Sequence, residues 1–147
     1  MQLFRRRRPS PAPPPAEVYP AAPDAGPRLL VCDDNNTVTQ LLEMMFEQQG
    51  WRVDVTASGE DGLAAVDRLV PDVVLLDQEM GGGLTGIETA RALRKRGYDR
   101  PVLLFSAYLD PKTTAAARRL DVVPVSKVDF PAVVRHVEAA RMAGARS

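Results

Sequence analysis

The feature that most constrains this chain is a regular alternation of short apolar runs with helical patterns over residues 28–142. The five runs are RLLVC, RVDVT, DVVLL, PVLLF and VVPV. Three of them are apolar almost throughout, which is typical of parallel strands covered on both faces of a sheet. RVDVT alternates and VVPV contains a proline, so we expect these two runs nearer the edges. The alternation predicts a doubly wound α/β fold with five parallel strands.

Helix-capping residues mark where the helical segments begin. Ser58 and Thr85 each stand three residues before an acidic side chain, which is the spacing of a capping box. Asp110 is followed by Pro111, which is an N-cap with proline at the first helical position. Asp129 is expected to begin the last helix, which carries an apolar stripe for the core. These signals predict helices between successive strands and after the last one.

Composition sets residues 1–27 apart from the rest of the chain. This segment holds eight of the 13 prolines and four consecutive arginines, Arg5 to Arg8. It has few apolar side chains to bury and favours extended polyproline conformations, so we predict a disordered tail. We expect one domain over residues 28–142 and a short C-terminal tail at residues 143–147.

Charge and hydropathy limit the function classes that suit the chain. Its 19 basic and 19 acidic residues do not suggest a general nucleic-acid-binding protein. No apolar stretch is long enough to span a membrane. The sequence FRRRR is followed by a proline-rich segment, not by the apolar region of a signal peptide. A cytoplasmic protein is therefore expected.

Several single residues are assigned to packing or to the surface. Met44, Met45 and Phe46 in the first helical segment are expected to pack in the core, not to bind a cofactor. Trp51 begins an outer strand and is expected to be partly exposed. Cys32, the single cysteine, lies in an apolar run and is expected to be buried and reduced. His136 is expected at the surface, since a phosphocarrier histidine would usually need a four-helix bundle.

Polar side chains follow four of the predicted strands, at the edge where ligands bind in sheets of this kind. They are Asp33 and Asp34 after the first strand, Asp77 after the third, Ser106 after the fourth and Lys127 after the fifth. Three neighbouring carboxylates repel one another, and Mg²⁺, which prefers oxygen ligands, resolves this conflict. One carboxylate is then a nucleophile towards a phosphoryl group, whose charge the lysine and the serine stabilise. The pattern predicts an aspartyl-phosphate site.

The segment after Asp77 contains the pattern G-x-G-x-x-G, from Gly81 to Gly86. In dinucleotide-binding proteins this pattern follows the first strand, and an acidic residue stands about 20 positions further on. Here the pattern follows the third strand, and Ser106 ends the next one. Asp77 and Glu79 would also place negative charge beside a pyrophosphate. We therefore interpret the glycines as a mobile loop behind a nucleophile.

Residues 28 to about 142 resemble the receiver domain of bacterial two-component response regulators, which has a flavodoxin-like (βα)5 fold. The resemblance rests on the order and spacing of the strand-end residues, which are Asp33-Asp34, Asp77, Ser106 and Lys127. It implies that a histidine kinase or phosphotransferase donates a phosphoryl group to Asp77 as part of a phosphorelay.

The same resemblance implies a role for each residue of the site. Mg²⁺ is held by Asp34, Asp77 and the backbone carbonyl of Glu79, while Asp33 reaches the metal through water. Ser106 and Lys127 contact the phosphoryl group. The residues that flank the path of the hydrolytic water are Glu79 and Tyr108. We expect the bulk of the tyrosine to screen that water and to prolong the phosphorylated state.

The sequence departs from the family pattern in three places. Met80 is followed by Gly81, where the family usually has proline, and the loop is one residue longer than usual. Val128 follows Lys127 in place of another usual proline. Pro124 stands where an aromatic residue usually reports phosphorylation. These changes leave the phosphoryl chemistry intact and put the usual aromatic readout in question.

Two other function classes remain as alternatives. One is a pseudo-receiver, a binding module with this fold that is not controlled by phosphorylation. The other is a phosphatase of the haloacid dehalogenase type, which also uses Asp, Ser or Thr, and Lys. Its nucleophile lies in an early D-x-D motif, however, whereas here an adjacent Asp pair comes first and Asp77 follows.

We expect a stand-alone regulator with no DNA-binding or enzymatic output domain. Its only chemistry would be its own phosphorylation and dephosphorylation. Output would then be contact with an unknown downstream protein, through the face formed by the fourth helix, fifth strand and fifth helix. Dimerisation on phosphorylation is an open alternative.

Overall fold

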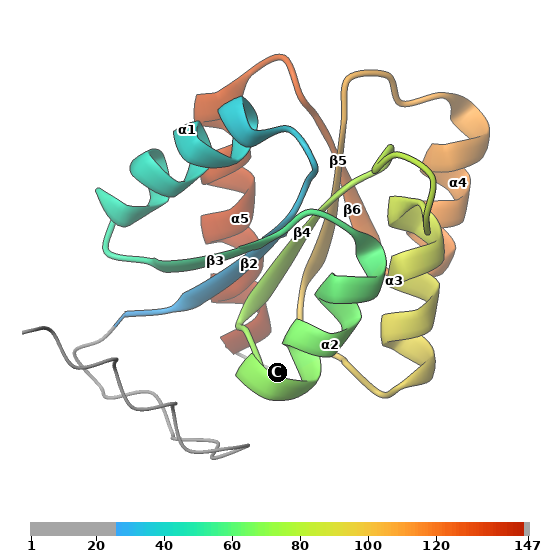
Figure 1. The fold of residues 1–147 in the computed structure, drawn as a ribbon, viewed down its shortest axis with the longest axis horizontal. Coiled ribbons are helices and arrows are strands. Elements are labelled where there is room, and N and C mark those ends of the chain that lie inside the picture. The colour runs from blue at the N-terminus through green and yellow to red at the C-terminus, as the bar shows by residue number, and fades with distance from the viewer. Residues whose placement is uncertain (1–25, 146–147) are drawn as a thin grey trace, which may run out of the picture.

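The computed structural model describes residues 26–145 as five strands that alternate with five helices (Figure 1). The expectations for residues 1–25 and 146–147 lie outside this part of the chain. The strands are β2 (Arg28–Cys32), β3 (Arg52–Thr56), β4 (Val73–Asp77), β5 (Val102–Ser106) and β6 (Val122–Ser126). The helices are α1 (Asn36–Glu47), α2 (Gly59–Leu69), α3 (Gly86–Lys95), α4 (Pro111–Arg119) and α5 (Phe130–Ala145).

The five strands form one sheet in the order β3-β2-β4-β5-β6, and all neighbours pair in parallel. The runs RVDVT and VVPV therefore lie at the two edges, as expected from their composition. The register places Asp77 beside Phe105, and Ser106 beside Ser126. The doubly wound α/β fold is confirmed, and the carboxyl ends of the strands lie together at one edge of the sheet.

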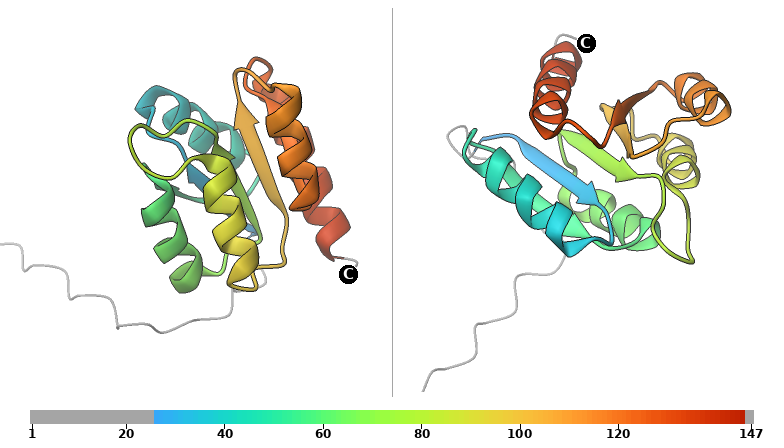
Figure 2. Two further views of the ribbon diagram at one scale, coloured as in Figure 1. Left: turned by 90° about the vertical axis from the view of Figure 1, so that its right-hand side faces the viewer. Right: turned by 90° about the horizontal axis from the view of Figure 1, so that it is seen from above.

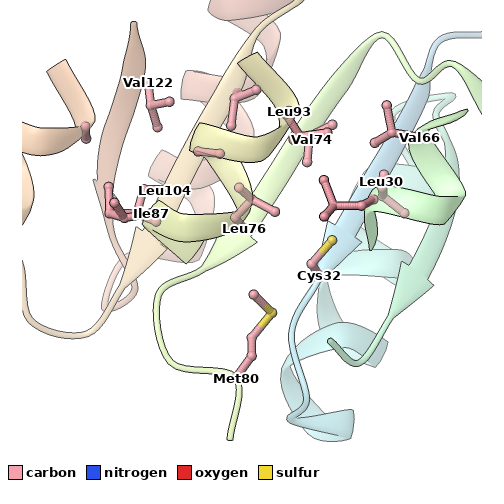
Figure 3. Packing of buried hydrophobic residues seen from close by; sticks show 14 of the residues in the cluster. Leu30, Cys32, Val66, Val74, Leu76, Met80, Ile87, Leu93, Leu104 and Val122 are labelled. Atoms are coloured by element: carbon pink, nitrogen blue, oxygen red, sulfur yellow. The ribbon is translucent and has the colours of Figure 1, made fainter. Parts of the chain in front are cut away.

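Alternate residues of each central strand contact opposite layers of helices. The helices α1 and α5 cover one face of the sheet, and α2, α3 and α4 cover the other (Figures 1 and 2). On the three-helix face, Leu30 packs beneath Val66 of α2 (Figure 3). Val74 and Leu104 pack beneath Leu93 and Ile87 of α3. Burial on both faces explains why these strands are apolar almost throughout.

The predicted helix starts are confirmed. The side chains of Ser58 and Thr85 accept hydrogen bonds from the backbone three residues on, and Thr85 forms a full capping box with Glu88. Asp110 caps α4 ahead of Pro111 at its first helical position. These caps satisfy backbone N–H groups that have no partner inside the helix, so local sequence fixes where each helix begins.

The domain extends slightly beyond residues 28–142 at both ends. The backbone carbonyl of Pro27 accepts a hydrogen bond of 2.8 Å from the N–H of Arg52. At the other end, α5 continues to Ala145. Within residues 26–145, no helix has the combined length and apolarity that crossing a lipid bilayer requires.

Two expectations about large side chains are wrong. Trp51 is only 3% exposed, because its ring packs edge-on against Phe46 and its Nε1 donates a 2.6 Å hydrogen bond to Glu138 of α5. Met44 is 51% exposed and points away from the core. The helical turn that buries Phe46 therefore leaves Met44 on the opposite, outer side of α1.

Arg94 joins four backbone carbonyls at the amino-terminal edge of the sheet. Its Nε donates to Leu120, its Nη1 to Tyr98 and Arg100, and its Nη2 to Asp121, all at 2.8–2.9 Å. One guanidinium thus connects the end of α3 to the turns that enter β5 and β6.

We predict that Arg94→Ala lowers the free energy of unfolding by about 2–4 kcal/mol, since four charge-assisted hydrogen bonds are lost. Urea denaturation monitored by circular dichroism measures this change. Arg91→Ala, at an exposed position of the same helix, is the matched control and should change stability by less than about 0.5 kcal/mol. Equal effects of the two substitutions would contradict the bridging role of Arg94.

Candidate functional site

A cleft of about 280 Å³ opens at the carboxyl edge of the sheet. It lies between the turns that follow β2, β4, β5 and β6. Its lining contains all the residues predicted for the site, which are Asp33, Asp34, Asp77, Glu79, Ser106, Tyr108 and Lys127, together with Asn35 and Ala107. The fold therefore brings into one cleft side chains that are up to 94 positions apart in the sequence.

Asp33 is buried and held by the backbone on two sides. Its N–H donates a 3.0 Å hydrogen bond to the carbonyl of Thr56 on β3, and its Oδ1 accepts one of 2.9 Å from the N–H of Asn35. Asp34 is exposed at the mouth of the cleft. The two neighbouring carboxylates thus differ in environment, one fixed inside the cleft and one open to solvent.

Asp77 is the last residue of β4, and its side chain is buried at the base of the cleft. Burial, and secondly the nearby charge of Asp33, raise its pKa from 3.8 to about 6, although Lys127 acts in the opposite direction. A group that titrates this close to neutral pH within a cleft is typical of a functional carboxylate.

Lys127 reaches from the end of β6 to both buried carboxylates. Its Nζ lies 2.9 Å from Oδ2 of Asp33 and 3.2 Å from Oδ1 of Asp77. Burial alone would lower the pKa of this lysine, but the two carboxylates outweigh that cost and raise it. The Nζ atom also lies 5.2 Å from the centre of the Phe105 ring. The ammonium is therefore charged and centrally placed.

The carboxylates satisfy the requirements of a site for a hard cation. Oxygen atoms of Asp33, Asp34 and Asp77 come within 4.8 Å of one another. Oδ2 of Asp33 is buried and, among the described residues, has no hydrogen-bond partner of good geometry; its 2.9 Å approach to Lys127 is an ionic contact. Three carboxylates this close together, with one lysine to offset their charge, form a set of oxygen donors that fits Mg²⁺.

Ser106 ends β5, and its hydroxyl group is occupied by its own turn. The Oγ atom donates to the carbonyl of Tyr108 at 2.9 Å and accepts from the N–H of the same residue at 3.3 Å. The carbonyl of Ser106 accepts a 2.9 Å hydrogen bond from the N–H of Lys127. Ser106 thus connects the ends of β5 and β6, while its hydroxyl is not bonded to Asp77.

Glycines in the segment from Gly81 to Gly86 allow the backbone to pass very close to Asp77 and Asp34. A Cβ atom at position 86 would lie 2.6 Å from both the carbonyl oxygen of Asp77 and Cδ1 of Leu104, so only glycine fits there. Gly81 has a φ of +50°, and a Cβ on it would lie 3.1 Å from Oδ2 of Asp34. With a carboxylate at its side, this loop is unsuited to cradle a pyrophosphate.

Three further residues that position the site were missed from sequence. Asn35 holds Asp33 and also caps α1, and its place before a helical pattern is a signal that could have identified it. Glu60 of α2 accepts a 3.2 Å hydrogen bond from the N–H of Leu84 and so anchors the glycine-rich loop. No local signal predicts that contact or the place of Phe105 beside the lysine.

Fold and site together define a signalling domain of the receiver class. The model of the family described as response regulator receiver domain matches residues 29–125. This chain belongs to that family, and it is a receiver domain of the two-component type. This match favours the receiver family over the alternative of a phosphatase of the haloacid dehalogenase type.

Curated relatives of similar sequence include transcriptional regulatory proteins. The transcriptional regulatory protein AfsQ1 of Streptomyces coelicolor is 37% identical over 84 residues, which cover 57% of this chain and 36% of that protein. The probable transcriptional regulatory protein TcrX of Mycobacterium tuberculosis is 33% identical over 79 residues, which cover 54% and 33%. The matched region thus spans about a third of the length of these relatives.

Solved structures share the fold. The receiver domain of the Francisella response regulator 1452 superposes with a TM-score of 0.74 at 24% identity, covering 80% of this chain and 98% of that one. The response regulator TrrA of Thermotoga maritima, solved in complex with Mg(2+)-BeF, gives a TM-score of 0.69 at 28% identity, covering 78% and 98%.

The raised pKa of Asp77 predicts that, without metal, the protein loses stability as the pH rises. A carboxyl group with a higher pKa in the folded than in the unfolded chain favours the folded state only while it is protonated. Between pH 3.8 and about 6, the free energy of unfolding should fall by on the order of 2 kcal/mol relative to Asp77→Asn. Urea titrations of both proteins in EDTA measure this difference. If the free energy of unfolding depended on pH in the same way in both proteins, the raised pKa of Asp77 would be contradicted.

Proposed function

We propose that this receiver domain is a phosphorylatable switch, which accepts a phosphoryl group on Asp77 from a histidine kinase or phosphotransferase. The observation that supports this best is the position of Asp77 at the base of the cleft, 3.2 Å from the ammonium of Lys127. With a pKa of about 6, the carboxylate is mostly ionised at neutral pH. It is therefore available as a nucleophile.

In the transfer, a carboxylate oxygen of Asp77 attacks the phosphorus atom of the donor. An O–P bond forms while the donor's P–N bond to histidine, or P–O bond to acetate in acetyl phosphate, breaks. The leaving group keeps the bonding electron pair, and a leaving imidazole takes up a proton. Lys127 is placed to pair with the phosphoryl oxygens as their charge approaches the aspartate.

The residues that would hold Mg²⁺ are Asp34 and Asp77 through their carboxylates, Glu79 through its backbone carbonyl, and Asp33 through water. Their donors are all oxygens, and the three aspartates already lie within 4.8 Å of one another. When bound, the ion would supply positive charge that offsets both the carboxylates and the phosphoryl oxygens. The response regulator TrrA, at 28% identity, was solved in complex with Mg(2+)-BeF, which supports the proposal that this chain also binds Mg²⁺.

Ser106 is the residue that would change partner on phosphorylation. Its hydroxyl now bonds to the backbone of Tyr108, whereas an aspartyl phosphate would offer three strong acceptor oxygens close by. Turning the hydroxyl towards them would release the turn that leads into α4. A partner that binds the released conformation better then shifts the population towards it.

The downstream partner is proposed to bind the face formed by α4, β6 and α5. Exposed apolar side chains lie on or beside this face, namely Val123, Val128 and Met142. Exposed apolar groups of this kind suit contact with another protein. The proposal thus includes a downstream protein partner and any dimer that forms on phosphorylation.

A binding module that does not respond to phosphorylation is the second candidate. Val128, directly after the lysine, is 80% exposed. Pro124 is half-buried in β6 at the position where the family usually has an aromatic residue. A receiver with the acidic cleft but without this readout could bind its partner constitutively.

A direct test uses acetyl phosphate, Mg²⁺ and intact mass measurement. We predict a mass increase of one phosphoryl group in the wild type and none in Asp77→Asn, which lacks the nucleophile. Omitting Mg²⁺, or substituting Asp34→Ala, should remove most of the labelling. Asp99→Asn, at an exposed position outside the cleft, is the matched control. An unlabelled but folded wild type would favour the binding module.

The lifetime of the phosphorylated state tests the role of Tyr108, which flanks the path of the hydrolytic water together with Glu79. Both line the cleft, and the tyrosine side chain is 74% exposed at its mouth. We expect it to screen the water that attacks phosphorus opposite the Asp77 oxygen. Tyr108→Ala should therefore shorten the half-life several-fold after the donor is removed, while Tyr108→Phe, which keeps the ring, should not. Equal decay in all three proteins would exclude screening.

A further inference from the structure

The outer face of α1 carries a shallow, open groove lined by acidic, amide and apolar side chains of this one helix. The groove has a volume of about 470 Å³ and lies along one side of the helix. Met44, in its middle, is 51% exposed, although methionine usually prefers the core. The residues that line it are Gln40, Glu43, Met44, Glu47 and Gln48. This helical spacing forms one continuous stripe on the side of α1 away from the sheet.

The charges on this stripe are arranged unfavourably for α1 itself. Glu43 and Glu47 stand four residues apart, where like charges repel, and Glu47 lies at the helix end that the macrodipole makes negative. Among the five described helices, α1 alone contains no lysine, arginine or histidine. Within residues 26–145, neither glutamate has a cationic group within 4.0 Å. A cationic ligand from outside this part of the chain would relieve the repulsion.

The chain contains such a ligand in its four consecutive arginines, Arg5 to Arg8. Residues 1–27 have four basic and two acidic side chains, whereas residues 28–142 have 14 basic and 17 acidic ones. The two parts therefore attract each other. Arginine also suits the walls of the groove, since its guanidinium group pairs with carboxylates and its methylene stem packs on apolar surface such as Met44.

The point at which the chain enters the fold places this segment within reach. A Cβ atom on Gly26 would collide with the carbonyl oxygen of Gly50, so the two backbones pass close together; Gly50 lies only three residues beyond the end of α1. Figure 1 shows the start of β2 beside the turn from α1 to β3. The 17 residues between Arg8 and Gly26 can span at most about 56–61 Å when fully extended, which is enough to reach along the groove, whose length is about 12 Å.

We propose that Arg5 to Arg8 dock in the groove on α1 of the same molecule. Their guanidinium groups pair with Glu43 and Glu47, and their stems cover Met44. The covalent connection makes docking intramolecular and so raises the local concentration of arginine, which lets individually weak ion pairs suffice. This contact lies away from the acidic cleft and does not depend on phosphorylation of Asp77.

The test uses a spin label at position 10 of the full-length chain. Ser10→Cys provides the attachment site, and native Cys32 does not compete because it is fully buried and burial raises its pKa to about 11. In ¹⁵N spectra, docking should cause loss of amide signal at Glu43, Met44, Glu47 and Gln48, but not in α3 or α4. Salt of about 1 M, where the Debye length is about 3 Å, should restore these signals.

Charge reversal separates specific pairing from general attraction. The double substitution Glu43→Lys and Glu47→Lys should abolish the signal loss, and changing Arg5 to Arg8 into glutamates in that background should restore it. Asp67→Lys with Asp99→Lys makes the same change of net charge at exposed sites elsewhere and should leave the signal loss intact. All four positions are at the surface, so the fold should survive.

Three outcomes would overturn the proposal. The first is signal loss that is insensitive to charge reversal on α1. The second is equal sensitivity to the control pair. The third is equally strong signal loss when spin-labelled protein without ¹⁵N is mixed with ¹⁵N protein that carries no spin label. This result would make a second copy of the chain the occupant of the groove.

Discussion

The contact of the Lys127 ammonium with Asp33 and Asp77 is the interaction on which the functional site depends. Two carboxylates buried side by side would repel each other and lose their hydration, at a cost of several kcal/mol per ion. The lysine lies 2.9 Å and 3.2 Å from them and offsets most of that cost. The compensation is incomplete, because the pKa of Asp77 remains raised to about 6. The remaining imbalance leaves the cleft ready for further positive charge.

This arrangement requires a parallel sheet with both faces covered. Parallel pairing brings the ends of β2, β4, β5 and β6 to one edge, where their polar residues meet. The backbone completes the site, since Asp33 is bonded to β3, and Ser106 to the N–H of Lys127. Gly86 allows α3 to begin directly against the carbonyl of Asp77. The packed core therefore fixes the backbone at the strand ends, and the backbone in turn fixes the position of each charged side chain.

The helix α1 connects two electrostatic features of the molecule. At its start, Asn35 caps the helix and holds Asp33 in the cleft. At its other end, Glu43 and Glu47 form an acidic stripe around the exposed Met44. The first feature belongs to the acidic cleft proposed to accept a phosphoryl group, and the second fits the proposed docking of the arginines that precede the domain. One amphipathic helix thus presents separate surfaces for the two proposed contacts.

The sequence by itself determined which strands are most buried, where the helices start and which polar residues meet in the cleft. Apolar periodicity, capping spacing and strand-end position are the local signals that carry this information. The sequence also indicated the edge strands through RVDVT and VVPV. Only the tertiary structure decided contacts between distant elements. Trp51 is buried because α5 supplies Glu138, and the glycine-rich loop is anchored because α2 supplies Glu60. Met44 is exposed because the rotation of α1 on the sheet, set by packing of neighbours such as Phe46, turns it outward.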